Sequence, residues 1–150
     1  MRVYLVIMDE TDEARVALRF ASRRAAASGG AVHILALVAK QNFNAFGGVQ
    51  ATIEQEAYDR AEVMASSAAG NLFSESGKMP SIAVRTGSGQ AVIKEYLAEH
   101  PEVAALVLGA TSEGGSNPLI SHFSAHAGSL PCPLYIVPGS FSAEDIDRLA

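Results

Sequence analysis

The sequence predicts one α/β domain over residues 1–150, with a doubly wound, five-stranded parallel sheet and helices on both of its faces. Three observations support this fold class: the length of 150 residues, a hydrophobic content of 49%, and short apolar runs that alternate with longer amphipathic segments. The length suits a single domain with a core of its own. Apolar strands that alternate with helices form a parallel sheet covered on both sides, because right-handed crossovers place the helices there.

Five short apolar runs predict the strands of this sheet. The first, Val3–Met8, is continuous and rich in β-branched residues, which is typical of a strand buried on both faces. The other four lie at residues 31–38, 81–85, 103–108 and 133–137. Gly, Pro and acidic residues stand at the ends of these runs and mark the turns between elements.

The segments between the strands predict the helices, because their apolar residues recur every three or four positions. They lie at residues 12–28, 49–76, 88–100 and 118–127. Thr11 and Ser88 are suited to cap two of them, and Pro118 suits the first turn of the last one because a proline needs no N–H donor there. The final segment, residues 139–150, predicts at most one further turn or a short helix.

The composition excludes several classes of partner. The net charge is −5 and the eleven basic residues are scattered, so no basic patch for a nucleic acid is predicted. No run approaches the roughly 20 apolar residues that span a bilayer, and the first residues lack the pattern of a signal peptide. One cysteine, Cys132, fits a reducing compartment. The sequence therefore predicts a cytoplasmic protein that binds neither a nucleic acid nor a membrane.

One stretch, LVLGATSEGGSNPLISHFS at residues 106–124, combines a strand end, a glycine-rich loop and a helix start. Free N–H groups and the dipole of the following helix favour an anion at such a place. In doubly wound sheets, ligands bind beyond the carboxyl ends of the strands, where the strand order reverses. Asp9, Val38, Thr86 and Gly109 stand at or directly after those ends. This edge of the sheet is the predicted ligand site.

Several segments resemble the universal stress protein family over nearly the whole chain. They are EARVALRFA after the first strand, TGSGQAVIKEYL before the fourth, VLGA at its end, and LPCPLYIVP at the fifth. The resemblance implies a sheet of the adenine nucleotide alpha hydrolase type, with the strand order 3-2-1-4-5. It also implies a homodimer that forms through the fifth strand, and binding of ATP in many members.

The ATP-binding members of that family carry the motif Gly-x2-Gly-x9-Gly-(Ser/Thr) after the fourth strand. Mapped by spacing, the first glycine is Gly109, the second position is Ser112, and the terminal pair falls on His122 and Phe123, followed by Ser124. One of the three glycines is thus matched. The Ser side chain crowds an approach of backbone to phosphate that glycine permits, and two bulky side chains replace the small terminal pair.

A second glycine-rich turn lies in the same loop. Gly114, Gly115 and Ser116 come directly before the fourth helix, and their backbone N–H groups would cradle a phosphate in a shifted register. By resemblance, Asp9 matches the acidic residue near the nucleoside, and Val38 belongs to the strand end that contacts the adenine of ATP or AMP. The structural alternatives stay open: a strand-end carboxylate that caps the next helix, and glycines that serve only turn geometry.

Residues for catalysis or metal binding do not form a recognisable set. His122 and His126 have the spacing of a chelating pair, but no third ligand is suitably placed. The serines lie outside any nucleophile elbow, and Cys132 has no basic neighbour. The predicted function is a non-enzymatic stress-response module that binds a nucleotide or another small anion. The alternative is a dimeric interaction module with no nucleotide bound. A third hypothesis, a slow ATPase, has no general base or nucleophile to support it.

Overall fold

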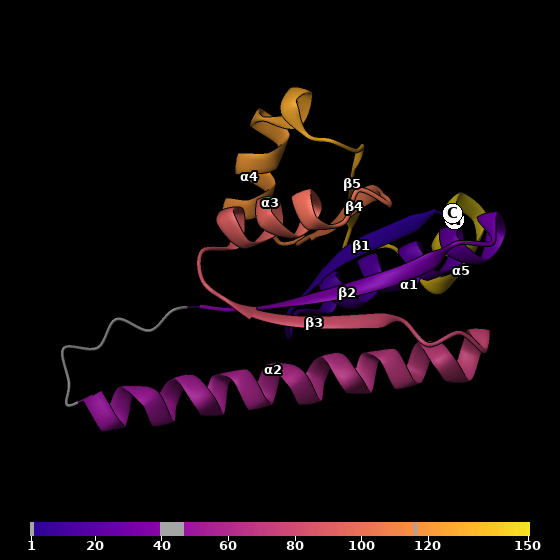
Figure 1. Cartoon of the computed structure of the whole chain (residues 1–150). Coiled ribbons are helices and arrows are strands. Elements are labelled where there is room, and N and C mark those ends of the chain that lie inside the picture. Colours follow the sequence, from indigo (N-terminus) through magenta and orange to yellow (C-terminus); the bar gives the residue numbers. More distant parts are fainter. Residues whose placement is uncertain (1, 40–46, 116) are drawn as a thin grey trace.

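The structure, a computed structural model, describes residues 2–39, 47–115 and 117–150. Its centre is a five-stranded sheet in which neighbouring strands are parallel, in the order β3-β2-β1-β4-β5 (Figure 1). The strands are β1 (Val3–Met8), β2 (Ala31–Val38), β3 (Ser81–Thr86), β4 (Val103–Ala110) and β5 (Leu134–Pro138). The predicted fold class and strand order are thereby confirmed.

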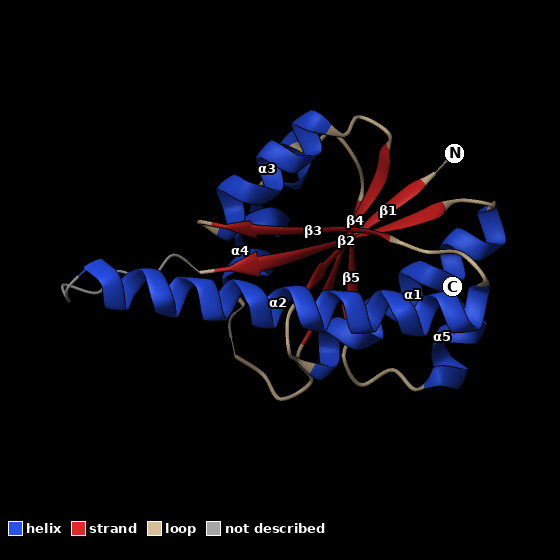
Figure 2. Cartoon of the chain, turned by 60° about the horizontal axis from the view of Figure 1, so that its bottom comes forward, coloured by secondary structure: helices blue, strands red, loops and turns tan. Residues whose placement is uncertain are grey.

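Helices cover both faces of the sheet, with α1, α2 and α5 on one face and α3 and α4 on the other (Figure 2). They are α1 (Asp12–Ser28), α2 (Gly47–Ser76), α3 (Gly89–Glu99), α4 (Pro118–Ala125) and α5 (Ala143–Leu149). A 3-10 turn, Ala127–Ser129, follows α4. None of the helices in the described residues combines the length and the apolar character needed to cross a bilayer.

The first helix shows how the sequence specifies its local structure. Thr11 accepts the backbone N–H of Ala14 at 3.3 Å and so caps the helix start. Gly29 ends the helix with a φ of +67°, a left-handed conformation that glycine adopts without strain. Between these ends, a buried stripe of small residues lets α1 lie close to the sheet. The stripe consists of Ala14, Ala17, Ala21 and Ala25.

The opposite face of the sheet is packed with larger side chains. Phe123 of α4 and Ile93 of α3 are completely buried against strand residues such as Leu106. The hydroxyl of Tyr96 lies 2.8 Å from Nδ1 of His33 and joins α3 to β2. The two apolar layers therefore fix the helices on both sides and hold the carboxyl ends of the strands at one edge.

Helix α2 is much longer than the strands beside it. Its 30 residues correspond to about 45 Å of helix, whereas the six residues of β3 span about 20 Å. The first turns of α2 consequently extend past the carboxyl edge of the sheet (Figure 1). The helix thus forms one side of any site at that edge.

Element ends differ in places from the sequence prediction. Strand β4 continues to Ala110 because Gly109 and Ala110 pair with the end of β5. Helix α4 ends at Ala125 and not at residue 127, since a 3-10 turn follows. Ser88 precedes α3, but its side chain makes no capping hydrogen bond. The C-terminal segment does form a helix, α5, with a capping box made by Ser142 and Asp145.

Candidate functional site

The strand order reverses at β1, because β2 pairs on one side of it and β4 on the other. Asp9 follows β1 directly and is exposed at this switch point. The ends of β2 at Val38 and of β4 at Ala110 flank it. Doubly wound sheets bind ligands at this location, since the connections on the two sides diverge and leave a crevice. Asp9, Val38 and Gly109 are thus brought to the same edge.

The two oxygens of the Asp9 carboxylate differ in their contacts: one accepts hydrogen bonds from Thr11, and the other is open to a ligand. Its Oδ1 accepts the backbone N–H of Thr11 at 2.9 Å and the Thr11 hydroxyl at 2.5 Å. Thr11 in turn caps α1. The described residues offer no hydrogen-bond partner to the second oxygen, Oδ2. The helix-capping explanation and a ligand-binding role are therefore compatible, because one oxygen serves each.

Two hollows meet at Asp9. The larger, of about 270 Å³, lies between the end of β2 and helix α2 and is lined by Val38, Arg60 and Met64 among others. The smaller, of about 30 Å³, lies between β4 and the starts of α1 and α4, and Gly109 and Asn117 line it. The smaller volume has room for only about two water molecules. A ligand of nucleoside size therefore fits only on the α2 side.

Gly109 is required by the packing of α1. A Cβ atom there would overlap the backbone carbonyl of Glu13. Gly139, after β5, is also held close to Glu13, since a Cβ would come within 2.8 Å of the Glu13 side chain. These glycines let the start of α1 lie directly over the ends of β4 and β5. The glycine at position 109 is explained by this contact without a phosphate.

The start of α4 has its backbone donors engaged. Pro118 has no N–H, and the Asn117 side-chain oxygen accepts from Leu119 at 2.9 Å and from Ile120 at 3.2 Å. The Asn117 carbonyl accepts the N–H of Ser121 at 2.9 Å. An anion at this helix start would have to displace the Asn117 side chain. A helix N-terminus favours anions because its N–H groups lack partners. Here the Asn117 side chain already provides the acceptor.

The glycine-rich loop lies beside that helix start. Gly114 and Gly115 are exposed and have φ values of +79° and +104°, which only glycine adopts readily. Ser112 is also exposed, and the Glu113 N–H donates to the Thr111 hydroxyl at 3.3 Å. Turn geometry accounts for both glycines, and a phosphate role for them stays a prediction. Ser116 lies outside the described residues.

His122, Phe123 and Ser124 lie inside α4, more than a turn beyond its first residue. Phe123 is completely buried in the core and has no surface for a ligand. Ser124 donates to the Ser121 carbonyl at 3.4 Å. The assignment of the motif's terminal pair to His122 and Phe123 therefore needs correction. The motif places nine residues between its second glycine and its terminal pair. The loop after β4 is shorter than that, so the positions of the terminal pair fall inside α4 and not at its start.

His122 packs within its own helix. Its ring stacks on His126 with centroids 4.4 Å apart and meets the Phe123 ring edge-on at 4.9 Å. Its Nε2 is buried without a hydrogen-bond partner among the described residues. Loss of solvation lowers the pKa of His122, and the nearby charges of His126 and Lys94 lower it further. The neutral imidazole is favoured, and no group of three potential metal ligands occurs in the described part of the chain.

The structure adds charged residues to the site that the sequence analysis did not select. Arg60 and Glu10 line the larger hollow, and Glu13 lines the smaller one. Arg60 itself is exposed, but it neighbours Ala57 and Ala61, which face inward on α2, and this position is the signal that could have identified it. The site therefore contains more negative than positive side chains.

Comparison with known proteins identifies relatives of the whole fold. The model of the Universal stress protein family matches residues 1–138. A search of curated proteins finds no match.

Solved structures share the fold at low sequence identity. The universal stress protein UspA from Lactobacillus plantarum has a TM-score of 0.75 and 19% identity, with 91% of this chain and 97% of that chain covered. A universal stress family protein from Arabidopsis thaliana with AMP bound has a TM-score of 0.61 and 15% identity, over 97% and 95%. A universal stress protein in complex with cAMP has a TM-score of 0.60 and 16% identity, over 93% and 98%.

Proposed function

The chain belongs to the universal stress protein family, and on that premise we propose that it binds an adenine nucleoside or its monophosphate at the carboxyl edge of the sheet. One observation carries the proposal: Asp9 stands at the switch point beside a hollow of about 270 Å³, with one carboxylate oxygen free of partners in the described residues. That oxygen would accept a ribose hydroxyl. We place the base between Val38 and α2. Two proteins of this fold have been solved with AMP bound and in complex with cAMP.

The charges around Asp9 favour a ligand with few phosphates. Among the described residues that line the two hollows, Arg60 is the one cationic side chain, while Asp9, Glu10 and Glu13 are acidic. A triphosphate would face these carboxylates and would find the α4 donors engaged by Asn117. Like charges at this range oppose binding unless a cation screens them. We therefore expect adenosine and AMP to bind more tightly than ATP without magnesium.

Isothermal titration with adenosine, AMP, cAMP, ADP and ATP, each with and without Mg²⁺, tests this proposal. Asp9→Ala should abolish binding of adenosine and AMP while the chain stays folded. Asp12→Ala is the matched control, because Asp12 is an exposed carboxylate of the same helix start and pairs with Arg15 away from the hollows. Equal affinities in wild type and Asp9→Ala would contradict the proposal.

A chain that binds none of these nucleotides would favour the alternative function, a dimeric interaction module. The packing role of Gly109 and the capped start of α4 support that alternative, since both features are explained without a ligand. The same titration therefore separates the two functions.

We propose further that the protein has no enzymatic activity. Burial raises the pKa of the Cys132 thiol, so its nucleophilic form is disfavoured. His33 is engaged with Tyr96 and lies at the opposite part of β2 from Asp9. Hydrolysis of ATP at the background rate in the presence of Mg²⁺ is the expected result, and a rate above background that Asp9→Ala removes would contradict it.

We also propose a homodimer that forms through β5 and a cytoplasmic location. Strand β5 pairs only with β4 in the described sheet, so its outer edge is open to a second chain. The single cysteine supports a reducing compartment.

A further inference from the structure

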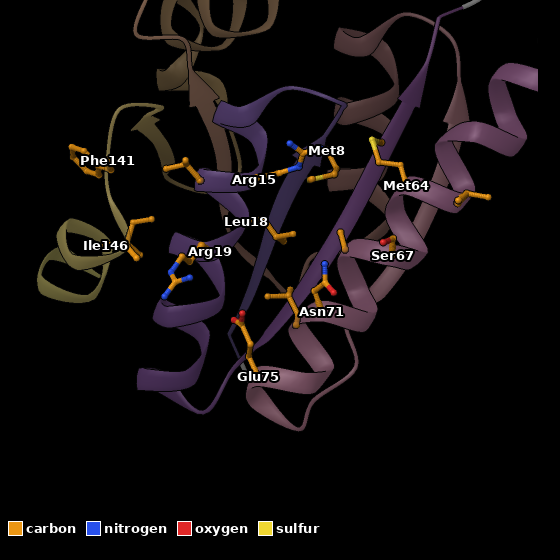
Figure 3. A pocket seen from close by; sticks show the side chains of 15 residues that line it. Met8, Arg15, Leu18, Arg19, Met64, Ser67, Asn71, Glu75, Phe141 and Ile146 are labelled. Carbon is orange, nitrogen blue, oxygen red and sulfur yellow. The ribbon is translucent and has the colours of Figure 1, made fainter.

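A third hollow exceeds both of the hollows at Asp9 in volume. It is a cleft of about 690 Å³ between α1, α2 and α5, here called the helix cleft (Figure 3). Its lining includes Met8, Arg19, Met64, Leu72, Glu75 and Ile146. Pockets that hold small molecules have volumes of roughly 300–1,000 Å³. The helix cleft lies within that range, whereas the hollows at Asp9 are smaller.

The cleft exists because two helices on one face of the sheet are held apart. Helix α1 packs mainly on β1 and β4, and α2 packs on β2 and β3. The inward residues of both helices are largely alanines, so each helix lies close to its own strands. Helix α5 then packs beside α1 at the end of the chain. The space between the helices is therefore a built feature of the fold.

The most deeply buried residues of the helix cleft are apolar, while Ser67, Asn71 and Glu75 add polar groups on α2. Met8, Leu18, Leu72 and Ile146 line the cleft and are at most 7% exposed. The residues that line it on α2 extend from Val63 to Glu75, a length of roughly 18 Å along the helix axis. An elongated apolar surface of this kind fits an extended hydrocarbon chain, which gains free energy from every methylene group that leaves water.

Among the described residues, Arg19 provides an unpaired anchor for a negative charge, whereas Arg15, which also lines the helix cleft, is paired with Asp12. Its Nε is buried and has no hydrogen-bond partner among the described residues. Two other arginines of α1 are paired, Arg15 with Asp12 and Arg23 with Asp147, each at 3.0 Å. No such ion pair is found for Arg19 within the described ranges. A carboxylate in the cleft would accept from the two terminal nitrogens of Arg19, in the bidentate geometry that guanidinium groups favour.

Glu75 restricts the charge of the ligand. It projects from α2 on the other side of the helix cleft from Arg19 (Figure 3). A second anionic group in the cleft would approach this carboxylate and be repelled. The described lining carries two arginines, Arg15 and Arg19, and one carboxylate, Glu75, so it has one excess positive charge. It therefore suits one negative charge and disfavours a polyphosphate or a dicarboxylate.

We propose that the helix cleft binds a fatty-acid-like monocarboxylate, with its carboxylate on Arg19 and its chain along the apolar surface from Met8 to Leu72. This site adjoins the proposed nucleotide site, with which it shares Met64, but the proposal does not depend on nucleotide binding. It gives the protein a means to sense free carboxylate amphiphiles.

Calorimetric titration with dodecanoate and 1-dodecanol, both below the concentration at which they aggregate, tests the proposal. The two ligands have hydrocarbon chains of the same length, so a difference in their affinity reports the contribution of the carboxylate. Wild type should bind dodecanoate about tenfold or more tightly than the alcohol. Arg19→Gln should remove this difference, and Arg19→Lys should retain part of it because the charge stays while the planar fork is lost.

Two further variants complete the test. Arg148→Gln removes an exposed arginine that pairs with Asp145 on α5, outside the cleft, and should bind dodecanoate like wild type. Ser67→Trp places a large side chain from an exposed position of α2 into the cleft and should weaken both ligands. Equal affinity of wild type for acid and alcohol, no saturable binding of either, or an unchanged preference in folded Arg19→Gln and Arg19→Lys would each overturn the proposal.

Discussion

At Gly109, the absence of a side chain determines how closely β4 approaches the start of α1. The Glu13 carbonyl occupies the space that a Cβ would need, and both partners are backbone atoms. Neither can move without shifting a strand or a helix. A residue that looks like part of a phosphate motif in the sequence is therefore also a packing residue.

Gly109→Ala should lower the free energy of unfolding by about 1–3 kcal/mol, the usual cost of overfilling a packed site. Gly128→Ala is a suitable control, since nothing lies within 4 Å of a Cβ there. Urea denaturation followed by circular dichroism measures both variants. A neutral Gly109→Ala would show that the strand and helix adjust freely, and the packing explanation would be wrong.

His33 couples the stability of the fold to pH. Burial lowers the pKa of His33, the nearby His100 lowers it further, and Glu102 opposes them. The folded chain therefore binds fewer protons than the unfolded chain at pH values just below 6.5, the ordinary pKa of a histidine. Stability is then fully present above that pH and decreases as the pH falls through the window below it.

The melting temperature should accordingly decline between pH 7 and about pH 5. His122 contributes in the same direction, because its pKa is also lowered in the folded chain. His33→Gln should make the decline shallower, and a further His122→Gln should flatten more of it. Differential scanning calorimetry at a series of pH values measures the slope. A decline as steep in the double variant as in wild type would exclude both histidines as its cause.

Among the elements, α4 shows best how a cap and a ligand site compete for the same groups. Asn117 satisfies the N–H groups of Leu119 and Ile120, which an anion would otherwise bind. Ser88 occupies the equivalent position before α3 and makes no side-chain hydrogen bond. Two helices with similar start signals in the sequence thus differ in how their donors are satisfied.

Asn117→Ala should reduce stability by about 0.5–2 kcal/mol, because two helix donors lose their acceptor. Ser88→Ala should be nearly neutral, as no bond is lost there. Thermal and urea unfolding of both variants provide the measurement. Equal losses for the two substitutions would mean that the Asn117 bonds contribute nothing to stability.

For the whole molecule, the sequence predicts the strands and helices better than the contacts and cavities between them. The continuous apolar run Val3–Met8 indicates a central strand, and Asp9 directly after it indicates the ligand edge, because both follow from local periodicity. The engaged donors of α4 and the packing role of Gly109 depend on contacts between distant elements. The helix cleft around Arg19 depends on the separation of α1 and α2, which no local pattern encodes.

Assembly is the remaining property at this scale, and the two edges of the sheet provide a matched test of it. Ile136 on β5 and Ile82 on β3 are 40% and 39% exposed. The two residues lie at opposite edges of the sheet but have nearly the same exposure. If the dimer forms through β5, Ile136→Lys places a desolvated charge in the interface and should dissociate it. Ile82→Lys should leave the dimer intact. Light scattering coupled to gel filtration should give twice the chain mass of 15.7 kDa for wild type and Ile82→Lys, and the single mass for Ile136→Lys. A monomeric wild type, or dissociation by Ile82→Lys alone, would contradict an interface at β5.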